Sequence, residues 1–401
     1  MTARWATATA FLAAVAFATA VHAQDLVVRA GTILPIAGDP IRNGVLVVRD
    51  GKVAAVGADV AVPAGVPVVE LPQSTIMPGL IDANAWEGCR GQLSEESREV
   101  FPSYKVARAL DPDSPQLRQL AQRGTTAVCL SPGHRAVIGG LCAVVQTAGP
   151  TREAMVVTDR AALQAVVGWE ASSGNRIPWR ESPDTFYYRR PTTRMGVVWE
   201  LRKAFFSVTE EGQPAPDPAD AEVLRAVVAG QLPLRVAVRR MIDIETTFRI
   251  ADEFGLHNLV LEEAFEAFKV ADEIARRNVP VVLSNLFYLG DGQPQTPEMH
   301  LNNAGILAKA GVKIAFGTAL SDGRPDLLTC AAIAHRYGLP RDDCLKALTV
   351  NAAEILGVAD RIGSLVPGKD ADFVVLSGDP LSVTSRVEQT YLAGKQVYNL
   401  R

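Results

Sequence analysis

Short apolar runs alternate with longer amphipathic stretches through the middle of the chain. The runs at residues 125–130, 234–238 and 312–316 are rich in aliphatic side chains and have the length of buried strands. Between residues 244 and 254, apolar side chains recur at the spacing of a helix that buries one face. Alternation of this kind predicts parallel strands joined by helical crossovers, which is an α/β fold.

The two ends of the chain carry a different pattern, in which β-branched runs surround turn residues. Residues 45–49 and 52–56 flank the pair Asp50-Gly51. Such a pair favours a tight hairpin because glycine takes a positive φ at little cost. Residues 373–398 repeat the alternation of strands and turns, so we predict one small β-sandwich built from both ends. The predicted boundaries are residues 24–76 with 365–401 for the sandwich, and 77–364 for the α/β domain.

The first residues have the character of a targeting segment. Arg4 precedes an apolar run at residues 6–20, and Val21-His22-Ala23 places small residues where a signal peptidase cleaves. We therefore predict a signal peptide at residues 1–23, a mature chain that starts at Gln24, and a periplasmic or secreted protein. An uncleaved anchor is the second interpretation. No later stretch is apolar enough to cross a bilayer, so no membrane span is expected after cleavage.

Composition narrows the range of functions. The chain has 401 residues, of which 48% are apolar and 21% charged, and this excludes a disordered protein. The net charge is −4 and the cations are scattered, so nucleic acid is not an expected partner. The five cysteines form no C-x-x-C pair, which argues against a thiolate zinc site and favours buried thiols. One disulfide remains an alternative.

Four phrases stand out along the chain: Met77-Pro78-Gly79-Leu80-Ile81-Asp82-Ala83, residues 311–318, residues 348–353 and residues 363–372. Together they resemble the amidohydrolase superfamily, in particular its imidazolonepropionase-like branch. The resemblance implies a distorted TIM-type (β/α)8 barrel plus a composite β-sandwich, with the active site at the carboxyl ends of the barrel strands. It also implies metal-assisted hydrolysis of carbon–nitrogen bonds other than peptide bonds.

The positions that hold metal ligands in the superfamily carry other side chains here. The resemblance maps those positions onto Asn84, Trp86, Ala237, Glu263 and Ala319. An indole and a methyl group offer no lone pair to a metal, and a neutral amide is a poor zinc ligand. We therefore predict no resident metal. Zinc or another divalent ion would be required only if the ligands had been rebuilt elsewhere.

Three residues are candidates for a rebuilt catalytic site. His134 follows a predicted strand on the functional side of the barrel. Glu263 belongs to an acidic group with Glu262 and Glu266, and strand alternation lets only one of the adjacent pair point inward. The other two would then cap the following helix. Asp322 lies three residues beyond Ala319 and is either a displaced acid or a loop or helix cap.

Three further residues are candidates for ligand binding: Arg240, Trp86 and Asn84. Arg240 either binds a substrate carboxylate or forms a salt bridge, for example to Asp243. Trp86 either fills the cavity that the missing ligands leave or stacks on a ligand ring. The fourth-strand ligand position cannot be placed from the sequence.

Two functions follow from this pattern. The first is a non-catalytic member of the family that binds a small molecule in the barrel mouth, or acts as a subunit in a homo-oligomer or beside an active homologue. The alternative is an active hydrolase of non-peptide carbon–nitrogen bonds with a relocated site. Function depends on the site and not on the fold, so the geometry of the barrel mouth has to separate them.

Overall fold

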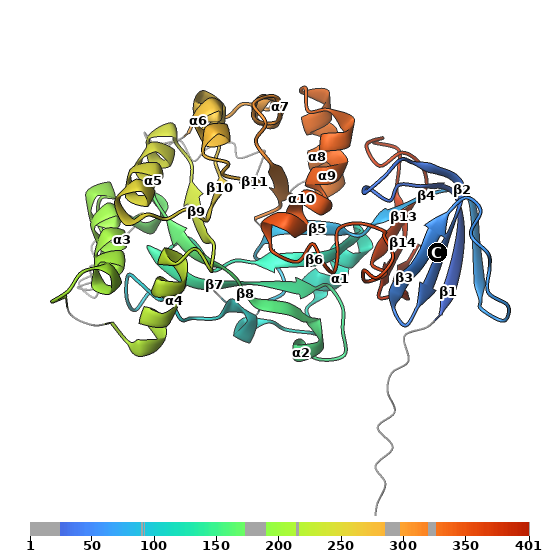
Figure 1. Cartoon of the computed structure of the whole chain (residues 1–401), viewed down its shortest axis with the longest axis horizontal. Helices are drawn as coiled ribbons and strands as arrows, with labels where there is room; N and C mark the ends of the chain where they lie inside the picture. Colours follow the sequence, from blue (N-terminus) through green and yellow to red (C-terminus); the bar gives the residue numbers. More distant parts are fainter. Residues whose placement is uncertain are drawn as a thin grey trace, which may run out of the picture.

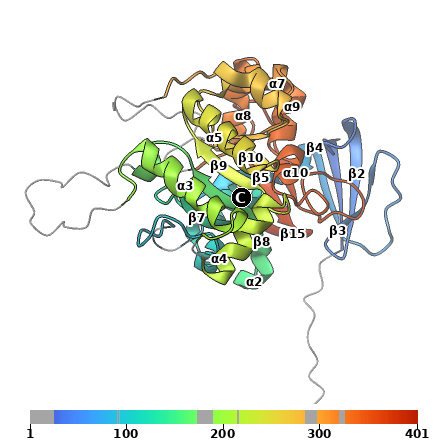
Figure 2. The same cartoon turned by 60° about the vertical axis from the view of Figure 1, so that its left-hand side comes forward.

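Two sheets organise the molecule, which we describe from a computed structural model (Figure 1). The structure describes residues 25–89, 91, 93–172, 190–213, 216–284, 297–319 and 326–400. The predicted signal peptide and Asp322 lie outside these residues. Figures 1 and 2 show a small sheet of β-strands standing at one side of a larger body of strands and helices.

The small sheet joins the two ends of the chain, as the sequence predicted. Its seven strands run in the order β15-β14-β13-β4-β1-β2-β3. All belong to one hydrogen-bonded sheet, and the finer prediction of a two-layer sandwich stays a prediction. The strands are β1 (Leu26–Ile33), β2 (Ile41–Arg49), β3 (Lys52–Gly57), β4 (Val68–Pro78), β13 (Phe373–Leu376), β14 (Val387–Leu392) and β15 (Lys395–Asn399).

The predicted hairpin at Asp50-Gly51 is confirmed. Strands β2 and β3 pair antiparallel around it, and the two turn residues have φ values of 49° and 73°. Positive φ at both central residues is the geometry that matches the natural twist of a two-stranded ribbon. Ala393-Gly394 makes the corresponding turn between β14 and β15, with φ values of 46° and 74°.

A single glycine links the small sheet to the barrel. Strand β4 ends at Pro78, and the first barrel strand begins at Leu80. A Cβ atom at Gly79 would lie 2.1 Å from Thr126 Oγ1, so no larger residue fits where the chain passes from one sheet to the other. This link positions the start of the first barrel strand.

The barrel sheet contains eight strands in the order β12-β11-β10-β9-β8-β7-β6-β5 and is nearly closed. The predicted fold of parallel strands needs one correction, because β7 runs antiparallel to both of its neighbours, β6 and β8. The strands are β5 (Leu80–Ala85), β6 (Thr125–Leu130), β7 (Ile138–Gln146), β8 (Val156–Val166), β9 (Leu234–Val238), β10 (Leu259–Glu263), β11 (Val281–Ser284) and β12 (Ile314–Gly317).

Helices lie around the outside of the barrel, and α5 to α8 follow β9 to β12 along one side (Figure 1). Their buried apolar faces join the strands in the main core. In the part of the chain that the structure describes, no helix is both long and apolar enough to span a membrane. The α-helices are α1 (Pro115–Gln122), α2 (Arg152–Met155), α3 (Arg194–Thr209), α4 (Pro218–Val228), α5 (Met241–Phe254), α6 (Ala271–Arg276), α7 (Asn303–Lys309), α8 (Leu327–Arg336), α9 (Arg341–Ala347) and α10 (Val350–Ile355), and the 3-10 turns are Val106–Ala109, Glu170–Ser172 and Ala267–Val270.

One aspartate joins the first and last strands of the barrel. Asp82 Oδ1 accepts hydrogen bonds from the backbone N–H groups of Asn84 and Thr318 at 3.0 and 3.1 Å. Its Oδ2 accepts from Thr318 Oγ1 at 2.6 Å. Just beyond, the Ala319 N–H donates to the Asn84 carbonyl at 2.8 Å. These bonds hold β5 and β12 side by side where no strand ladder joins them.

Candidate functional site at the barrel mouth

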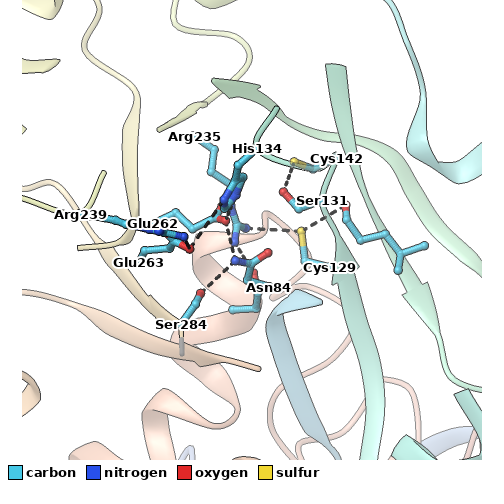
Figure 3. Close-up of polar contacts among 12 residues, drawn as sticks. Asn84, Cys129, Ser131, His134, Cys142, Arg235, Arg239, Glu262, Glu263 and Ser284 are labelled. Carbon is cyan, nitrogen blue, oxygen red and sulfur yellow. Dashed lines mark hydrogen bonds and ion pairs between the residues drawn. The ribbon is translucent and has the colours of Figure 1, made fainter. Parts of the chain in front are cut away.

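A buried polar cluster fills the carboxyl ends of the barrel strands (Figure 3). Asn84 on β5 points its amide across the barrel toward β10 and β11. The amide nitrogen donates to Glu262 Oε1 at 2.5 Å and to Ser284 Oγ at 2.9 Å. All three side chains are fully buried. The position that the resemblance assigned to a metal ligand is thus a hydrogen-bond donor to a carboxylate.

Arg235 supplies the cation of this cluster. It is the second of the five residues of β9 and is 1% exposed. Its Nε pairs with Glu262 Oε2, one terminal nitrogen donates to the Ala83 carbonyl at 2.6 Å, and the other lies 3.4 Å from the Cys129 sulfur. Burial opposes ionisation of Glu262, but the Arg235 charge and the His134 hydrogen bond outweigh it and lower the pKa of that carboxyl to about 2.

His134 lies between two glutamates, in the loop that joins β6 to β7. Its Nε2 is 2.9 Å from Glu262 Oε1, and its Nδ1 is 3.7 Å from Glu263 Oε1 and has no hydrogen-bond partner. Burial disfavours the charged ring, yet the hydrogen bond to Glu262 and the charges of both glutamates raise the pKa of His134. The Trp86 ring meets the imidazole edge to face, with centroids 5.2 Å apart.

Glu263 binds a second arginine. Its two oxygens accept from Arg239 at 2.5 and 3.1 Å, and Arg239 also pairs with Glu170 at 3.0 Å. Burial raises the pKa of Glu170, against the opposing charge of Arg239. Strand alternation predicted that only one of Glu262 and Glu263 would point into the barrel. This prediction is wrong, because Glu263 and Ala264 have positive φ and the regular alternation of the strand ends there. Both carboxylates therefore reach His134.

The predicted cap by Glu266 needs a correction as well. Its two carboxylate oxygens accept from the backbone N–H groups of Met241 and Glu298, both at 2.9 Å. Met241 is the first residue of α5, so Glu266 caps the helix of the preceding crossover and not the one that follows it in the chain. Glu262 caps no helix either, since it is buried in the barrel mouth.

Arg240 lies at the start of α5 beside this cluster. Its backbone N–H donates to Asp243 Oδ2 at 3.1 Å, and its side-chain Nε is buried without a hydrogen-bond partner. The Asp243 carboxylate is paired with Arg194. The contact between Arg240 and Asp243 is thus a helix cap made by the backbone, and the guanidinium is not used in it.

A cavity of about 650 Å³ opens beside the cluster. Its wall includes Trp86, His134, Trp169, Glu170 and Arg239. The indole N–H of Trp86 is buried and has no hydrogen-bond partner. The wall thus combines two large aromatic side chains with a few polar groups, and the buried His134 Nδ1 behind it also lacks a hydrogen-bond partner, which is the composition of a small-molecule site.

Comparison with known proteins agrees with this architecture. The Amidohydrolase family matches residues 240–397. An amidohydrolase from Thermotoga maritima MSB8 is 30% identical, and the structures superpose with a TM-score of 0.82 over 94% of this chain and 100% of that one. The chain belongs to the amidohydrolase family. The resemblance noted in the sequence is thereby confirmed.

Two curated relatives of this amidohydrolase-family chain cover most of its length. The imidazolonepropionase of Rhizorhabdus wittichii is 25% identical over 366 residues, which are 84% of this chain and 88% of the relative. The amidohydrolase tasK of Hapsidospora irregularis is 23% identical over 379 residues, and the match covers 82% of this chain but 38% of the relative. The chain therefore corresponds to less than half of that larger protein.

The side chains of the barrel mouth do not fit a catalytic divalent metal. Ala237 and Ala319 are buried and apolar, and Trp86 presents only an N–H donor. Glu262 uses both oxygens, one toward Asn84 and His134 and one toward Arg235. Among the described residues, no group of three His, Cys, Asp or Glu side chains is arranged to hold a metal ion.

The sequence placed part of this site and missed part of it. Asn84, His134, Trp86 and Glu263 do converge at the barrel mouth. Arg235, which the sequence analysis did not single out, supplies the cation that pairs with Glu262 at the centre of the cluster. A signal for it existed, because an arginine inside a short apolar strand is costly to bury unless a carboxylate pairs with it, and Glu262 ends the neighbouring strand.

Proposed function

We propose that this amidohydrolase-family protein binds a small molecule in the cavity at the barrel mouth and carries out no metal-dependent hydrolysis. The observation that supports the proposal is that Glu262 already binds Arg235, Asn84 and His134, so this carboxylate is not available to a divalent ion. Trp86 and His134 form the wall that meets the ligand. The predicted signal peptide adds to the proposal that this binding takes place outside the cytoplasm.

Metal analysis of the pure chain tests this proposal. We expect the chain that starts at Gln24 to hold no stoichiometric zinc, manganese or iron after purification and dialysis against these ions. We also expect no turnover of hydantoins, cyclic imides or acyl-peptides. The amidohydrolase from Thermotoga maritima is a matched comparison for the same procedure. One tightly held ion per chain, with turnover that a chelator abolishes, would contradict the proposal.

A second function has one specific observation in its favour. With the His134 proton on Nε2, where Glu262 accepts it at 2.9 Å, the Nδ1 lone pair has no partner and belongs to a residue of the cavity wall. A carboxylate that orients a histidine in this way is the arrangement of a general base. The alternative is thus a metal-independent hydrolase of non-peptide carbon–nitrogen bonds, in which His134 activates water.

Substitution of His134 separates the two functions. If the alternative holds, His134→Gln lowers kcat by about 10²–10⁴-fold and leaves the fold intact, because it removes only the proton acceptor. His257→Gln is the matched control, since His257 is exposed and lines a different cavity with Asn258 and Asn278, away from the barrel mouth. Equal rates in wild type and His134→Gln would eliminate the alternative, as would the absence of any turnover in wild type.

A further inference from the structure

We propose that Arg235 has taken the place of a metal ion as the cation of the barrel mouth, and that its guanidinium closes a latent divalent-metal site formed by Glu262, His134 and Asn84. This inference rests on the proposed function and extends it. It states why the chain would bind no metal and which single side chain prevents it.

The contacts of the guanidinium place a positive charge beside two of the mapped ligand positions, Asn84 and Glu263. It binds Glu262 on one side and the carbonyl of Ala83, the neighbour of Asn84, at 2.6 Å on another. Glu262 in turn accepts from Asn84 and from His134. Figure 3 shows these side chains converging on Glu262 from β5, β9 and the loop after β6.

The same geometry excludes a second cation. Glu262 is 0% exposed and needs an opposite charge, because an unpaired carboxylate is expensive to bury. The guanidinium already provides that charge, and a divalent ion beside it would be repelled across a few ångströms of protein interior. Arginine stays protonated at any physiological pH, so the positive charge at this position is permanent.

Removal of the guanidinium would leave three kinds of metal ligand close together: a carboxylate, an imidazole and an amide oxygen. Glu262 Oε2 would be free, and His134 lies 2.9 Å from the other oxygen of that group. Asn84 Oδ1 is already buried without a hydrogen-bond partner. Carboxylate, imidazole and amide oxygen suit Mn²⁺, and the carboxylate and the imidazole suit Zn²⁺. The latent site is therefore assembled from side chains that need no new residue.

Uptake of Zn²⁺ or Mn²⁺ by Arg235→Met tests this inference. Each variant is incubated with one of the two ions, desalted and analysed for metal per chain, and its thermal midpoint is measured with and without chelator. We expect about one ion per chain in Arg235→Met, none in wild type, and a chelator-reversible rise in the midpoint of the variant alone. Arg235→Lys, which keeps a cation, should take up none. Arg235→Met/Glu262→Gln, which lacks the anionic ligand, should also take up none.

Three outcomes would overturn the inference. The first is a folded Arg235→Met that stays free of metal, and the second is a wild type that takes up an ion through Glu262. The third is an Arg235→Met that fails to fold both with and without added ions while Arg235→Lys folds, since an added ion would fill a real latent site. Metal-free turnover by wild type would instead contradict the proposed function and leave the role of Arg235 standing.

Discussion

Replacement of Glu262 by alanine is expected to lower the free energy of unfolding by about 3–5 kcal/mol, the usual cost of breaking a buried ion pair. The substitution leaves the Arg235 guanidinium buried at 1% exposure with a carbonyl and a thiol as its remaining partners. It also removes the acceptor of the Asn84 and His134 hydrogen bonds. Denaturant unfolding at neutral pH measures the loss.

Two controls define this prediction. Glu253→Ala breaks the pair with Arg202 at the surface and should cost far less than Glu262→Ala, because water and salt screen an ion pair there. Arg235→Met/Glu262→Leu replaces both buried charges by apolar side chains and should recover most of the loss, because neither charge is then left without a partner. A cost for Glu262→Ala no larger than that for Glu253→Ala would show that the buried pair does not hold the barrel mouth.

Stability is expected to fall as the pH rises from about 4 to about 7, and Asp82 is expected to cause most of this fall. Burial, aided by the nearby charge of Glu87, raises the pKa of Asp82 from 3.8 to about 7. In this window the folded chain keeps the proton and the unfolded chain releases it. The contribution of Asp82 is therefore fully present below about 3.8 and is lost as the pH passes about 7, by about 4 kcal/mol in total.

Asp82→Asn isolates this effect. The amide oxygen can still accept from the N–H groups of Asn84 and Thr318, and the amide nitrogen can donate to the Thr318 hydroxyl. We expect the variant to keep the closed barrel and to lose most of the pH dependence between 4 and 7. A smaller slope should remain, because burial also raises the pKa of Asp372 to about 6. An unchanged slope in unfolding curves recorded across this range would exclude Asp82 as its source.

The direction of β7 shows where sequence reasoning about the fold stopped. The strands at residues 125–130 and 234–238 are where the apolar runs predicted them. The spacing of apolar residues shows where a strand lies but not in which direction it runs. We assumed that all barrel strands were parallel, and β7 instead runs antiparallel to β6. The connection at residues 131–137 was the available clue, since a parallel crossover requires a dozen or so residues.

The site was harder to predict than the fold for a chemical reason. From the sequence, Ala237 and Ala319 offer no metal ligand and Asn84 offers only a poor zinc ligand, so other side chains with lone pairs became the candidates. A metal ion at such a site can also be replaced by a positively charged side chain. Arg235 offers no lone pair, so a search for ligands passes over it, although it is the residue that binds Glu262 in the structure. The ion pair between Arg235 and Glu262 could be predicted only with the register of β9 and β10, and that register cannot be read from the sequence.

The small sheet is built from two segments that lie far apart in the sequence, and this has a consequence for protein synthesis. Strand β13 lies between β14 and β4, so strands that are synthesised after the barrel complete a sheet that strands synthesised before the barrel begin. Until residues 373–376 arrive, β4 presents one unpaired edge of backbone N–H and C=O groups, and such edges recruit strands from other molecules. A ribosome that stops short of residue 373 would therefore release a chain prone to aggregate, even though the entire barrel had been translated.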